Sequence, residues 1–414
     1  MSTSGLTSDT DDLAGPGRLP TDSARGRWSI PSIPQALRIP LPATAIGVYA
    51  GIRVLGLMIA AVLLRHGAFR QPNGSLKQLI IGDDGGFYRL VAAHGYQYNP
   101  SQLAHASVLS FLPGYPAAID SLAWLPGVSI ALAGFVVTIL AGLAAAWGLA
   151  ALGMKLTADP RISLLMVALW SVAPGSIALS RVYSEALFCA LAVWALVALV
   201  DRRWLTAGAL VSLAGTVRSA ALALIAAVAV AVIISLIQTA RTRQPIGRWW
   251  RPIAALLLAP LGLLGYWGYV AAVTHRLDGW FWIEKYAFHM SFDWGAGTVR
   301  VIGVTILDKP SAVALMVVLA ILTAVGLTAW SLTERIPAYL HVYTVVVALM
   351  AFTTSAAWVS SKPRFFLAAV LLALPLARLL APLRTSVLVT LIAVLTAAST
   401  WFGMYLMIIA KWAP

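Results

Sequence analysis

The chain has 414 residues, of which 60% are hydrophobic and only 11% are charged, and its formal net charge is +14. A soluble protein of this length could not cover its surface with so few charged side chains. The basic excess lies in short connections between apolar blocks, which is typical of membrane proteins and argues against a nucleic-acid partner. The composition therefore predicts that the partner surrounding this protein is a lipid bilayer.

The first forty residues differ from the rest of the chain. Residues 1–40 are rich in Ser, Thr, Asp, Gly and Pro and contain no apolar run, so we expect a disordered cytoplasmic tail. No signal-peptide core with a cleavage site follows. The first apolar block, Ala43–Leu64, is long enough to be a retained membrane helix. Residues 41–414 are expected to form one transmembrane domain.

Ten further apolar blocks follow along the chain. In hydrocarbon each backbone amide must be paired within its own segment, so these blocks predict helices and an all-α, polytopic fold of about eleven segments. A twelfth stretch, Ser107–Leu125, is broken by Pro113 and Pro116 and is expected to be re-entrant or interfacial. The ten blocks are Val128–Leu152, Ile162–Leu179, Ala186–Val200, Leu205–Gly215, Ala220–Ile237, Ile253–Val273, Ala312–Trp330, Leu340–Phe352, Phe365–Leu376 and Val387–Ile409.

The distribution of basic residues predicts the orientation. With the N-terminus in the cytoplasm, every short basic loop falls on the cytoplasmic side, as positive-inside retention requires. This agreement depends on treating Leu205–Gly215 and Ala220–Ile237 as two segments that meet around residues 216–219. The loops concerned contain Lys155 and Arg161, Arg202 and Arg203, Arg241 to Arg251, Arg335, and Arg378 and Arg384.

Two long connections, residues 65–127 and 274–311, then lie on the extracytoplasmic side. They hold most of the His and acidic residues outside the tail, together with many aromatic residues. Long connections in a compact membrane protein usually carry function. We therefore expect an extracytoplasmic site built from these two long loops.

The first connection contains the densest polar cluster, Gly-Asp-Asp-Gly-Gly-Phe-Tyr at residues 82–88. Its glycines would let the backbone approach a ligand closely, and the Asp83 or Asp84 carboxylate can accept a proton from a sugar hydroxyl. The alternative is a polar turn that leads into an interfacial helix, Tyr88–His94. A second element at residues 110–116, which includes Tyr115 between two prolines, is either the lining of a cavity or a plain interfacial turn.

Two polar groups lie at helix ends further along the chain. Tyr183, Ser184 and Glu185 precede a helix, where capping by Ser184 and a favourable position of Glu185 in the first turn could explain both residues. Arg218 is flanked by apolar segments, and its planar guanidinium suits a phosphate. The alternative for Arg218 is a snorkelling side chain in a short outer turn.

The second connection and a late basic cluster supply the remaining candidates. Aromatic residues from Trp280 to Tyr286, followed by His289 and Trp294, suit the faces of sugars but equally suit a lipid-interface belt. Lys362 and Arg364 are predicted to lie on the outer side, where they would bind an anionic lipid phosphate or serve as snorkelling anchors. We find no metal-ligand pattern, nucleotide-binding loop or hydrolase elbow, so no metal or cofactor is expected.

Taken together, these elements resemble the PIG-V-like mannosyltransferases, a branch of the GT-C membrane glycosyltransferases. The Trp-Asp-x-x-Trp-Tyr pattern of that family is matched by residues 83–88, with Asp84 at its acidic position and Asp83 in place of the tryptophan. Its remaining elements are echoed in the same order by Leu112-Pro113-Gly114-Tyr115-Pro116, Tyr183-Ser184-Glu185-Ala186-Leu187-Phe188, Arg218-Ser219-Ala220 and Pro363-Arg364-Phe365, and the continuation His94-Gly95-Tyr96 is also similar. The Arg-Ser-Asn-Gly element of the family is only half kept.

This resemblance implies a GT-C-like fold and an inverting transfer of mannose from a polyprenyl-phosphate carrier to a glycolipid, glycan or protein acceptor outside the plasma (cytoplasmic) membrane. It implies that Asp84 is the general base, with Asp83 as the alternative. Arg218, Arg364 and Lys362 would bind the donor phosphate. The other site candidates are Tyr88, His94, Tyr115, Tyr183, Glu185, His289 and Trp294.

Two other classes of function remain open on the sequence. A transporter or flippase of a lipid-linked or hydrophobic solute would have internal repeats with paired broken helices. A non-catalytic partner subunit of another transferase would need none of the candidate residues for chemistry. Loss of sugar transfer in a folded Asp84→Asn variant would separate the enzyme from both alternatives.

Overall fold

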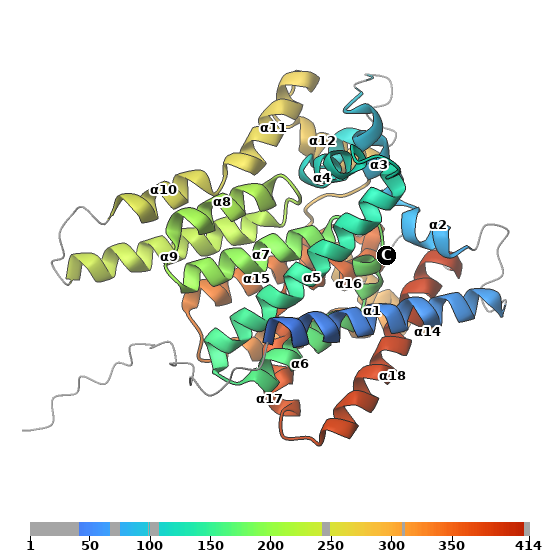
Figure 1. Cartoon of the computed structure of the whole chain (residues 1–414). Coiled ribbons are helices and arrows are strands. Elements are labelled where there is room, and N and C mark those ends of the chain that lie inside the picture. Colours follow the sequence, from blue (N-terminus) through green and yellow to red (C-terminus); the bar gives the residue numbers. More distant parts are fainter. Residues whose placement is uncertain are drawn as a thin grey trace, which may run out of the picture.

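The computed structural model describes residues 41–66, 75–97, 99, 107–241, 249–308 and 311–409, so the predicted tail lies outside the described residues. The first half of the described chain is a series of helices (Figure 1). Its elements are α1 (Leu41–Arg65), α2 (Leu76–Ile81), α3 (Asp84–His94), η2 (Val108–Ser110), α4 (Gly114–Ala123), α5 (Ile130–Thr157), α6 (Pro160–Ser171), η3 (Ser176–Ser180), α7 (Glu185–Val200), α8 (Trp204–Gly215) and α9 (Ala221–Arg241).

The second half is also helical, and within the described ranges the only extended pairing is an isolated bridge between Phe292 and Thr354. The all-α prediction is therefore confirmed. The elements are α10 (Trp250–Leu258), α11 (Leu261–Thr274), α12 (Gly279–Ala287), α13 (Ala296–Leu307), α14 (Ala312–Ser331), α15 (Ala338–Thr353), η5 (Ala356–Ser361), α16 (Lys362–Phe365), η6 (Phe366–Ala368), η7 (Val370–Leu372), α17 (Ala373–Leu380), α18 (Thr385–Met404) and η8 (Tyr405–Ile409).

Six helices of the described chain are long and apolar enough to cross a membrane, and a bent pair raises this number to seven if it forms one span. The bent pair, Val359–Ala368 and Val370–Leu380, turns by 83° at its break. Each predicted apolar block falls on helical structure, although several of these helices are too short to span a bilayer alone. The protein is a multi-pass membrane protein. The six long helices are Leu41–Arg65, Ile130–Thr157, Ala221–Arg241, Trp250–Thr274, Ala312–Ser331 and Thr385–Ile408.

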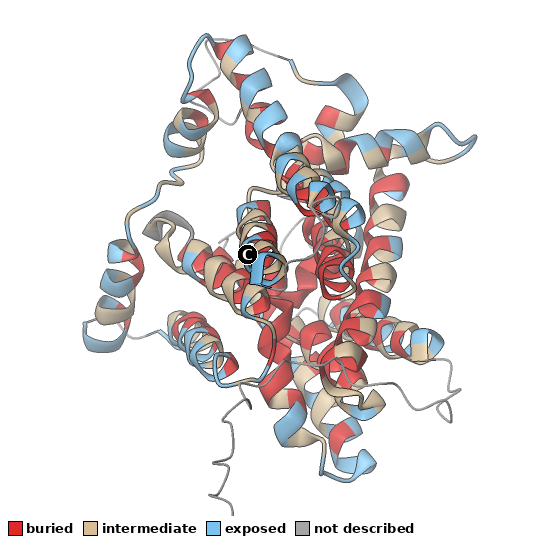
Figure 2. Cartoon of the chain, turned by 90° about the vertical axis from the view of Figure 1, so that its left-hand side faces the viewer, coloured by how far each residue is buried: buried red, intermediate tan, exposed pale blue. Residues whose placement is uncertain are grey.

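Helix α7 lies at the centre of the molecule. Nearly all of its residues are buried, and Figure 2 shows that buried residues gather in the middle of the molecule. A helix that is apolar all round is expected in such a position. Helix α5 packs along it, with the indole nitrogen of Trp194 donating to the carbonyl of Ala144 at 3.1 Å. The absent side chain of Gly148 makes room for Trp194 in this contact. The N-terminus of α7 is thereby held inside the protein.

The predicted block Ile162–Leu179 is not one helix. Helix α6 ends at Ser171, and Pro174 and Gly175 separate it from η3. The guanidinium of Arg53 on α1 donates to the carbonyl of Ser171 and, at 2.6 Å, to that of Ser176. These donors satisfy carbonyls that a broken helix leaves without intrahelical partners, which a chain inside a membrane must provide from its own side chains.

The predicted break between the blocks Leu205–Gly215 and Ala220–Ile237 is confirmed. Helix α8 ends at Gly215 and α9 begins at Ala221, with Arg218 in the turn between them. The block Phe365–Leu376 differs from the prediction, because short 3-10 turns interrupt it before α17. Helix propensity and hydropathy do not distinguish such turns from a continuous helix when neighbouring segments satisfy the freed backbone groups.

The two connections that were expected to be long loops are largely helical where they are described. The first contains α2, α3, η2 and α4, and the second contains α12 and α13. Figure 1 shows α12 beside α3 and α4, at the same end of the molecule. The two connections therefore meet, but as packed helices rather than as irregular loops.

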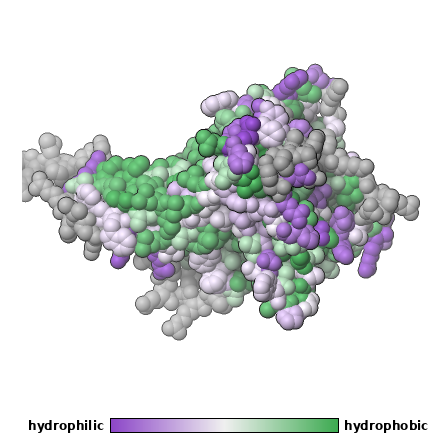
Figure 3. Space-filling view, turned by 90° about the horizontal axis from the view of Figure 1, so that it is seen from above, coloured by the Kyte–Doolittle hydropathy of each residue, from purple (hydrophilic) through white to green (hydrophobic). Residues whose placement is uncertain are grey.

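A broad hydrophobic surface covers the part of the molecule where α9 and α10 lie (Figure 3). Its exposed side chains include Ile233 on α9 and Leu257 on α10. Hydrophilic residues gather elsewhere in the same view. Large apolar side chains that face outward over whole helices are expected where a membrane protein contacts lipid chains.

Candidate active site

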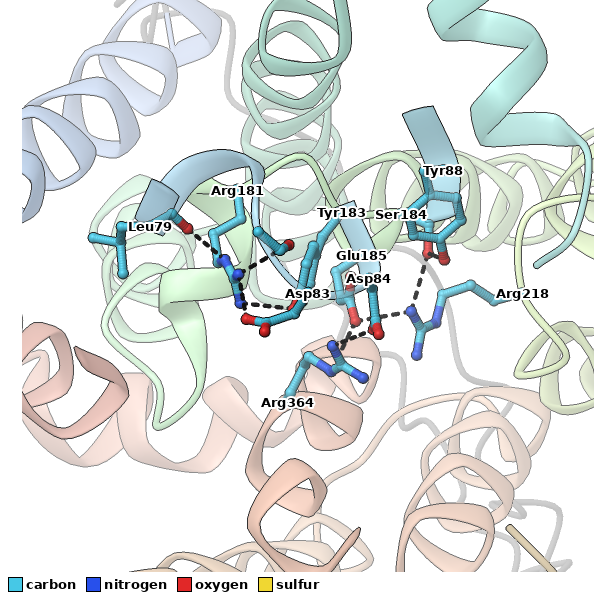
Figure 4. Close-up of polar contacts among 11 residues, drawn as sticks. Leu79, Asp83, Asp84, Tyr88, Arg181, Tyr183, Ser184, Glu185, Arg218 and Arg364 are labelled. Carbon is cyan, nitrogen blue, oxygen red and sulfur yellow. Dashed lines mark hydrogen bonds and ion pairs between the residues drawn. The ribbon is translucent and has the colours of Figure 1, made fainter. Parts of the chain in front are cut away.

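Four breaks in the helical structure come together beside the N-termini of α3 and α7 (Figure 4). They are the turn before α3, the segment between η3 and α7, the turn between α8 and α9, and α16. Each break supplies polar side chains that point toward the others. These residues are Asp83, Asp84, Tyr88, Arg181, Tyr183, Ser184, Glu185, Arg218 and Arg364, and we call them the charged cluster.

Asp84 is the first residue of α3, and its Oδ2 accepts a hydrogen bond from Nη1 of Arg364 at 2.8 Å. The Asp84 side chain is 30% exposed, whereas that of Arg364 is 8% exposed. The carboxylate is therefore anchored on one side by a buried cation and open on the other. It also lies in the first turn of α3, where the helix dipole attracts negative charge.

Glu185 forms ion pairs with two arginines of the charged cluster, Arg218 and Arg364. It is the first residue of α7 and is buried, and its Oε1 lies 2.8 Å from Nη1 of Arg218 and 3.2 Å from Nε of Arg364. Its second oxygen is buried and has no hydrogen-bond partner among the described residues. Glu185 thus fixes both guanidinium groups at one place.

Ser184 connects Arg218 to α3. Its hydroxyl accepts from Nη1 of Arg218 at 3.0 Å and lies 2.7 Å from the hydroxyl of Tyr88. Burial raises the pKa of Tyr88 well above its usual value, so the phenol stays neutral. Ser184 occupies the N-cap position of α7 but makes no capping hydrogen bond with its side chain. The capping interpretation of Ser184 is therefore wrong, because its hydroxyl is used by Arg218 and Tyr88.

Asp83 is bound separately, to the buried Arg181. The carboxylate Oδ2 lies 2.7 Å from Nη2 of Arg181, whose other N–H groups donate to the carbonyls of Leu79 and Gly82 and to the hydroxyl of Tyr183. Four of the five guanidinium N–H groups are thereby engaged. Asp83 has φ 51° and ψ −127°, a conformation that a non-glycine residue adopts only when its surroundings hold it.

The charged cluster contains three carboxylates and three guanidinium groups, so its formal charges balance. Removing the buried members of the cluster from water costs several kcal/mol for each ion, and ion pairing recovers this cost only partly. A hydrophobic core of the same shape would be at least as stable. Charges retained among membrane helices are for this reason candidates for function.

Tyr183 belongs to the charged cluster, and Tyr115 packs against it. Tyr183 is fully buried, and its ring lies between the guanidinium carbons of Arg181 and Arg364, at 4.2 Å and 5.0 Å from its centroid. Tyr115 lies behind the cluster, where its hydroxyl donates to the carbonyl of Gly134 at 3.0 Å and its ring meets that of Tyr88 edge to face. Tyr115 supports the site from the core.

Lys362 lies two residues before Arg364 and is fully buried. Its ammonium is within 2.7–3.2 Å of three carbonyl oxygens, those of residues 351, 352 and 354, and of the hydroxyl of Thr354. These oxygens come from the end of α15. The contacts fasten α16 to α15 and so fix the backbone that carries Arg364.

Gly175 supports the same backbone from the other side. Its φ is +84°, and a Cβ at this position would lie 2.7 Å from the backbone nitrogen and 2.9 Å from the Cα of Arg364. Only glycine allows both the conformation and the approach. The break between α6 and η3 therefore makes room for the backbone of Arg364.

Besides Tyr115 and Lys362, three predicted site residues lie outside the charged cluster. His94 is exposed at the opposite end of α3 from Asp84, about 15 Å along the helix axis. His289 and Trp294 are exposed in the segment between α12 and α13, with Trp294 84% accessible. This position of the two residues fits the aromatic-belt interpretation better than the sugar-binding one.

Three residues that the structure brings to this region are not among the site residues predicted from the sequence. Arg181 is the partner of Asp83, and Ser110 on η2 is close to Glu284 on α12. The signal for Glu284 was its spacing of four residues from Trp280 and from Phe288, which places all three on one face of a helix. Among the described residues no group of three or more His, Cys, Asp and Glu side chains could hold a metal ion.

These features define a class: a multi-pass helical membrane protein with a partly exposed carboxylate held beside two guanidinium groups at the ends of broken helices. The Mannosyltransferase (PIG-V) family matches residues 70–374, which is most of the chain, and the chain belongs to that family. The family-level prediction is confirmed.

Two comparisons with known proteins show how much of the chain is matched. The chain is 33% identical over 168 residues to GPI alpha-1,6-mannosyltransferase 2 of Mus musculus, a match that covers 36% of this chain and 32% of that protein. The crystal structure of ArnT from Cupriavidus metallidurans bound to undecaprenyl phosphate is similar with a TM-score of 0.49 and 14% identity. That similarity covers 87% of this chain and 63% of the ArnT chain. The chain thus matches about a third of the curated relative's length.

Proposed function

We propose that this protein is an inverting glycosyltransferase that moves mannose from a polyprenyl-phosphate carrier to a hydroxyl group of a glycolipid, glycan or protein acceptor. Membership of a mannosyltransferase family and the mannosyltransferase relative support the reaction and the sugar. The lipid-linked donor is inferred from a site among membrane helices that has guanidinium groups for a phosphate. No nucleotide-binding loop occurs in the sequence.

The single observation that carries this proposal is the position of Asp84. Its carboxylate is partly open and lies in one ion-pair network with Arg364 and, through Glu185, with Arg218. Arg218 uses only Nη1 for its hydrogen bonds among the described residues, and no hydrogen bond of Nη2 of Arg364 is found there. A base and unused phosphate-binding N–H groups therefore stand side by side.

The reaction follows from this arrangement. The acceptor hydroxyl gives its proton to Asp84 while its oxygen forms a bond to the anomeric carbon of the sugar. The bond between that carbon and the phosphate oxygen breaks, and its electron pair goes to the phosphate. Because a phosphate monoester is a stable anion, it leaves without a strong acid, and Arg218 and Arg364 stabilise the charge that develops on it.

Asp83 has a structural role that differs from the role of Asp84 as the base. Arg181 has four of its five N–H groups engaged and so has little capacity for a phosphate. Asp83 holds the turn before α3 against this arginine and thereby orients Asp84. The proposed side of the membrane is extracytoplasmic, which rests on the positive-inside pattern of the short basic loops.

The test compares Asp84→Asn with Asp83→Asn and wild type in a transfer assay. Purified protein is given several labelled polyprenyl-phosphate sugars and a membrane extract as acceptor. Loss of a general base costs about 10²–10⁴-fold in rate, so we expect Asp84→Asn to lose almost all transfer. It should lose less stability than Asp83→Asn, because Arg364 keeps a second counter-charge in Glu185. Asp83→Asn should lose stability first, because it leaves the buried Arg181 without its counter-charge.

Three results would contradict the proposal or part of it. Full activity of Asp84→Asn would remove Asp84 from the chemistry. Absence of transfer by the wild type with every lipid-phosphate sugar would favour a transporter or a non-catalytic subunit. Accessibility labelling that located residue 84 in the cytosol would contradict the proposed side of the membrane.

A further inference from the structure

One face of α12 is directed at the charged cluster. Trp280 donates from its indole nitrogen to the carbonyl of Ser110 at 3.4 Å. Phe288, at the other end of the helix, has ring contacts with Phe87 at 5.9 Å and with Phe111 at 5.7 Å. Residues four apart share a helix face, so Glu284, midway between positions 280 and 288, faces η2 and α3 as well.

The surroundings of Glu284 are polar on one side only. The Ser110 hydroxyl is beside its carboxyl group, and it is buried with no well-formed hydrogen bond among the described residues. The titratable or charged groups within electrostatic range of Glu284 are Asp84 on α3, Arg218 before α9 and Tyr266 on α11. Glu284 is not a member of any salt bridge within the described ranges.

Burial raises the pKa of Glu284 to about 8, against its ordinary value of 4.5. The proximity of the Asp84 carboxylate acts in the same direction, while Ser110 and Arg218 act against it. The group is therefore a neutral carboxylic acid at neutral pH. In that form it offers both a hydroxyl donor and a carbonyl acceptor, which an ionised carboxylate does not.

We propose that Glu284 and Ser110 form a subsite that binds hydroxyl groups of the transferred sugar. This inference rests on the proposed function. The sugar must lie next to the phosphate and next to the base, and Glu284 is within electrostatic range of both Arg218 and Asp84 while lying on a helix that carries no member of the charged cluster. Two neighbouring side chains that each donate and accept hydrogen bonds suit the paired hydroxyls of a hexose.

Neutrality also suits the charge of the donor. The charged cluster has balanced charges, and the donor brings a phosphate anion to it. An ionised Glu284 would add a negative charge beside that anion and weaken its binding. Donor binding should therefore decline as pH rises through about 8, as Glu284 loses its proton.

The experiment measures the kcat and donor KM of wild type, Glu284→Gln and Glu284→Ala over a pH range from about 6 to 9. Glutamine keeps a donor and an acceptor but cannot ionise, so Glu284→Gln should keep kcat and lose the alkaline rise in KM. Glu284→Ala should raise the donor KM about tenfold at neutral pH, the effect of one lost hydrogen bond to substrate. The matched control is Asp278→Asn, an exposed carboxylate at the start of the same helix, which should change neither quantity.

Three results would overturn the subsite. First, Glu284→Gln could lose its kcat, which would make Glu284 the base. Second, Glu284→Gln could keep the rise in donor KM at alkaline pH that the wild type shows. Third, Glu284→Ala could have the same donor KM as the wild type. If the wild type transfers no sugar, the proposed function itself fails. Binding of polyprenyl-phosphate mannose then decides: weaker binding by Glu284→Ala than by wild type supports the subsite, and equal binding overturns it.

Discussion

Gly175→Ala tests whether the position of the Arg364 backbone controls the reaction. The added Cβ would lie 2.7 Å from the backbone nitrogen of Arg364 and 2.9 Å from the carbonyl carbon of Pro363, closer than real Cβ contacts. The neighbouring atoms belong to the backbone and cannot rotate away, so α16 has to shift. A misplacement of about 1 Å from a change outside the chemistry can cost about 10²-fold in rate, and we expect a loss of that order in kcat.

Gly127→Ala is the matched control for this variant. Gly127 has φ +80°, close to the +84° of Gly175, but no heavy atom of the described residues lies within 4 Å of the position that its Cβ would occupy. The conformational cost of alanine at positive φ, about 1–2 kcal/mol, is therefore common to the two variants. Only Gly175→Ala adds the collision with Arg364. The assay is transfer of labelled sugar at saturating donor, with thermal unfolding measured on the same samples.

The two variants separate the effect of moving the Arg364 backbone from the effect of lost protein stability. If only Gly175→Ala loses kcat at a temperature where both variants remain folded, the position of the Arg364 backbone controls the reaction. Equal activity of the two alanine variants would refute the reasoning, because it would mean that α16 tolerates the shift or that Arg364 has no part in the chemistry.

Two further predictions concern the cations. Arg218→Lys keeps the charge but loses the planar fork, so we expect the donor KM to rise about tenfold with a smaller change in kcat, measured by steady-state kinetics. Lys362→Met leaves the oxygens at the end of α15 without their donor, at about 1–3 kcal/mol for each unsatisfied group, so the unfolding temperature should fall. A donor KM of Lys362→Met that rises without any loss of stability would show instead that Lys362 binds the phosphate.

The fold class was accessible from the sequence because long apolar blocks in a membrane have one solution, the helix. The turn between α8 and α9 was also predictable, since Arg218 interrupts the apolar pattern there. The break after α6 was not predicted, although Pro174 and Gly175 mark it, because the apolar block continues across these residues. Its freed carbonyls are paired by Arg53, which lies more than a hundred residues away. Hydropathy registers local composition and contains no information about such a partner.

The candidate site was predicted in part for a similar reason. Asp84, Glu185, Arg218 and Arg364 carry the family motifs, and the structure brings them together. Lys362 lies in the same motif, yet its contacts are to backbone oxygens. A motif records that a residue type is needed, but not whether its side chain meets a ligand or another part of the chain.

The ion pairs of the charged cluster have a consequence for substrate binding. Arg364 is bound to the carboxylate that we propose as the base, so the donor phosphate and Asp84 compete for one guanidinium group. A phosphate that binds the unused N–H groups of Arg218 and Arg364 draws these side chains toward the donor and loosens the ion pair with Asp84. The carboxylate oxygen that Arg364 held then becomes available to the acceptor hydroxyl. Without the donor, that oxygen stays paired with Arg364 and is less available to water. The buried ion pairs thus cost stability but link the availability of the base to occupancy of the phosphate site.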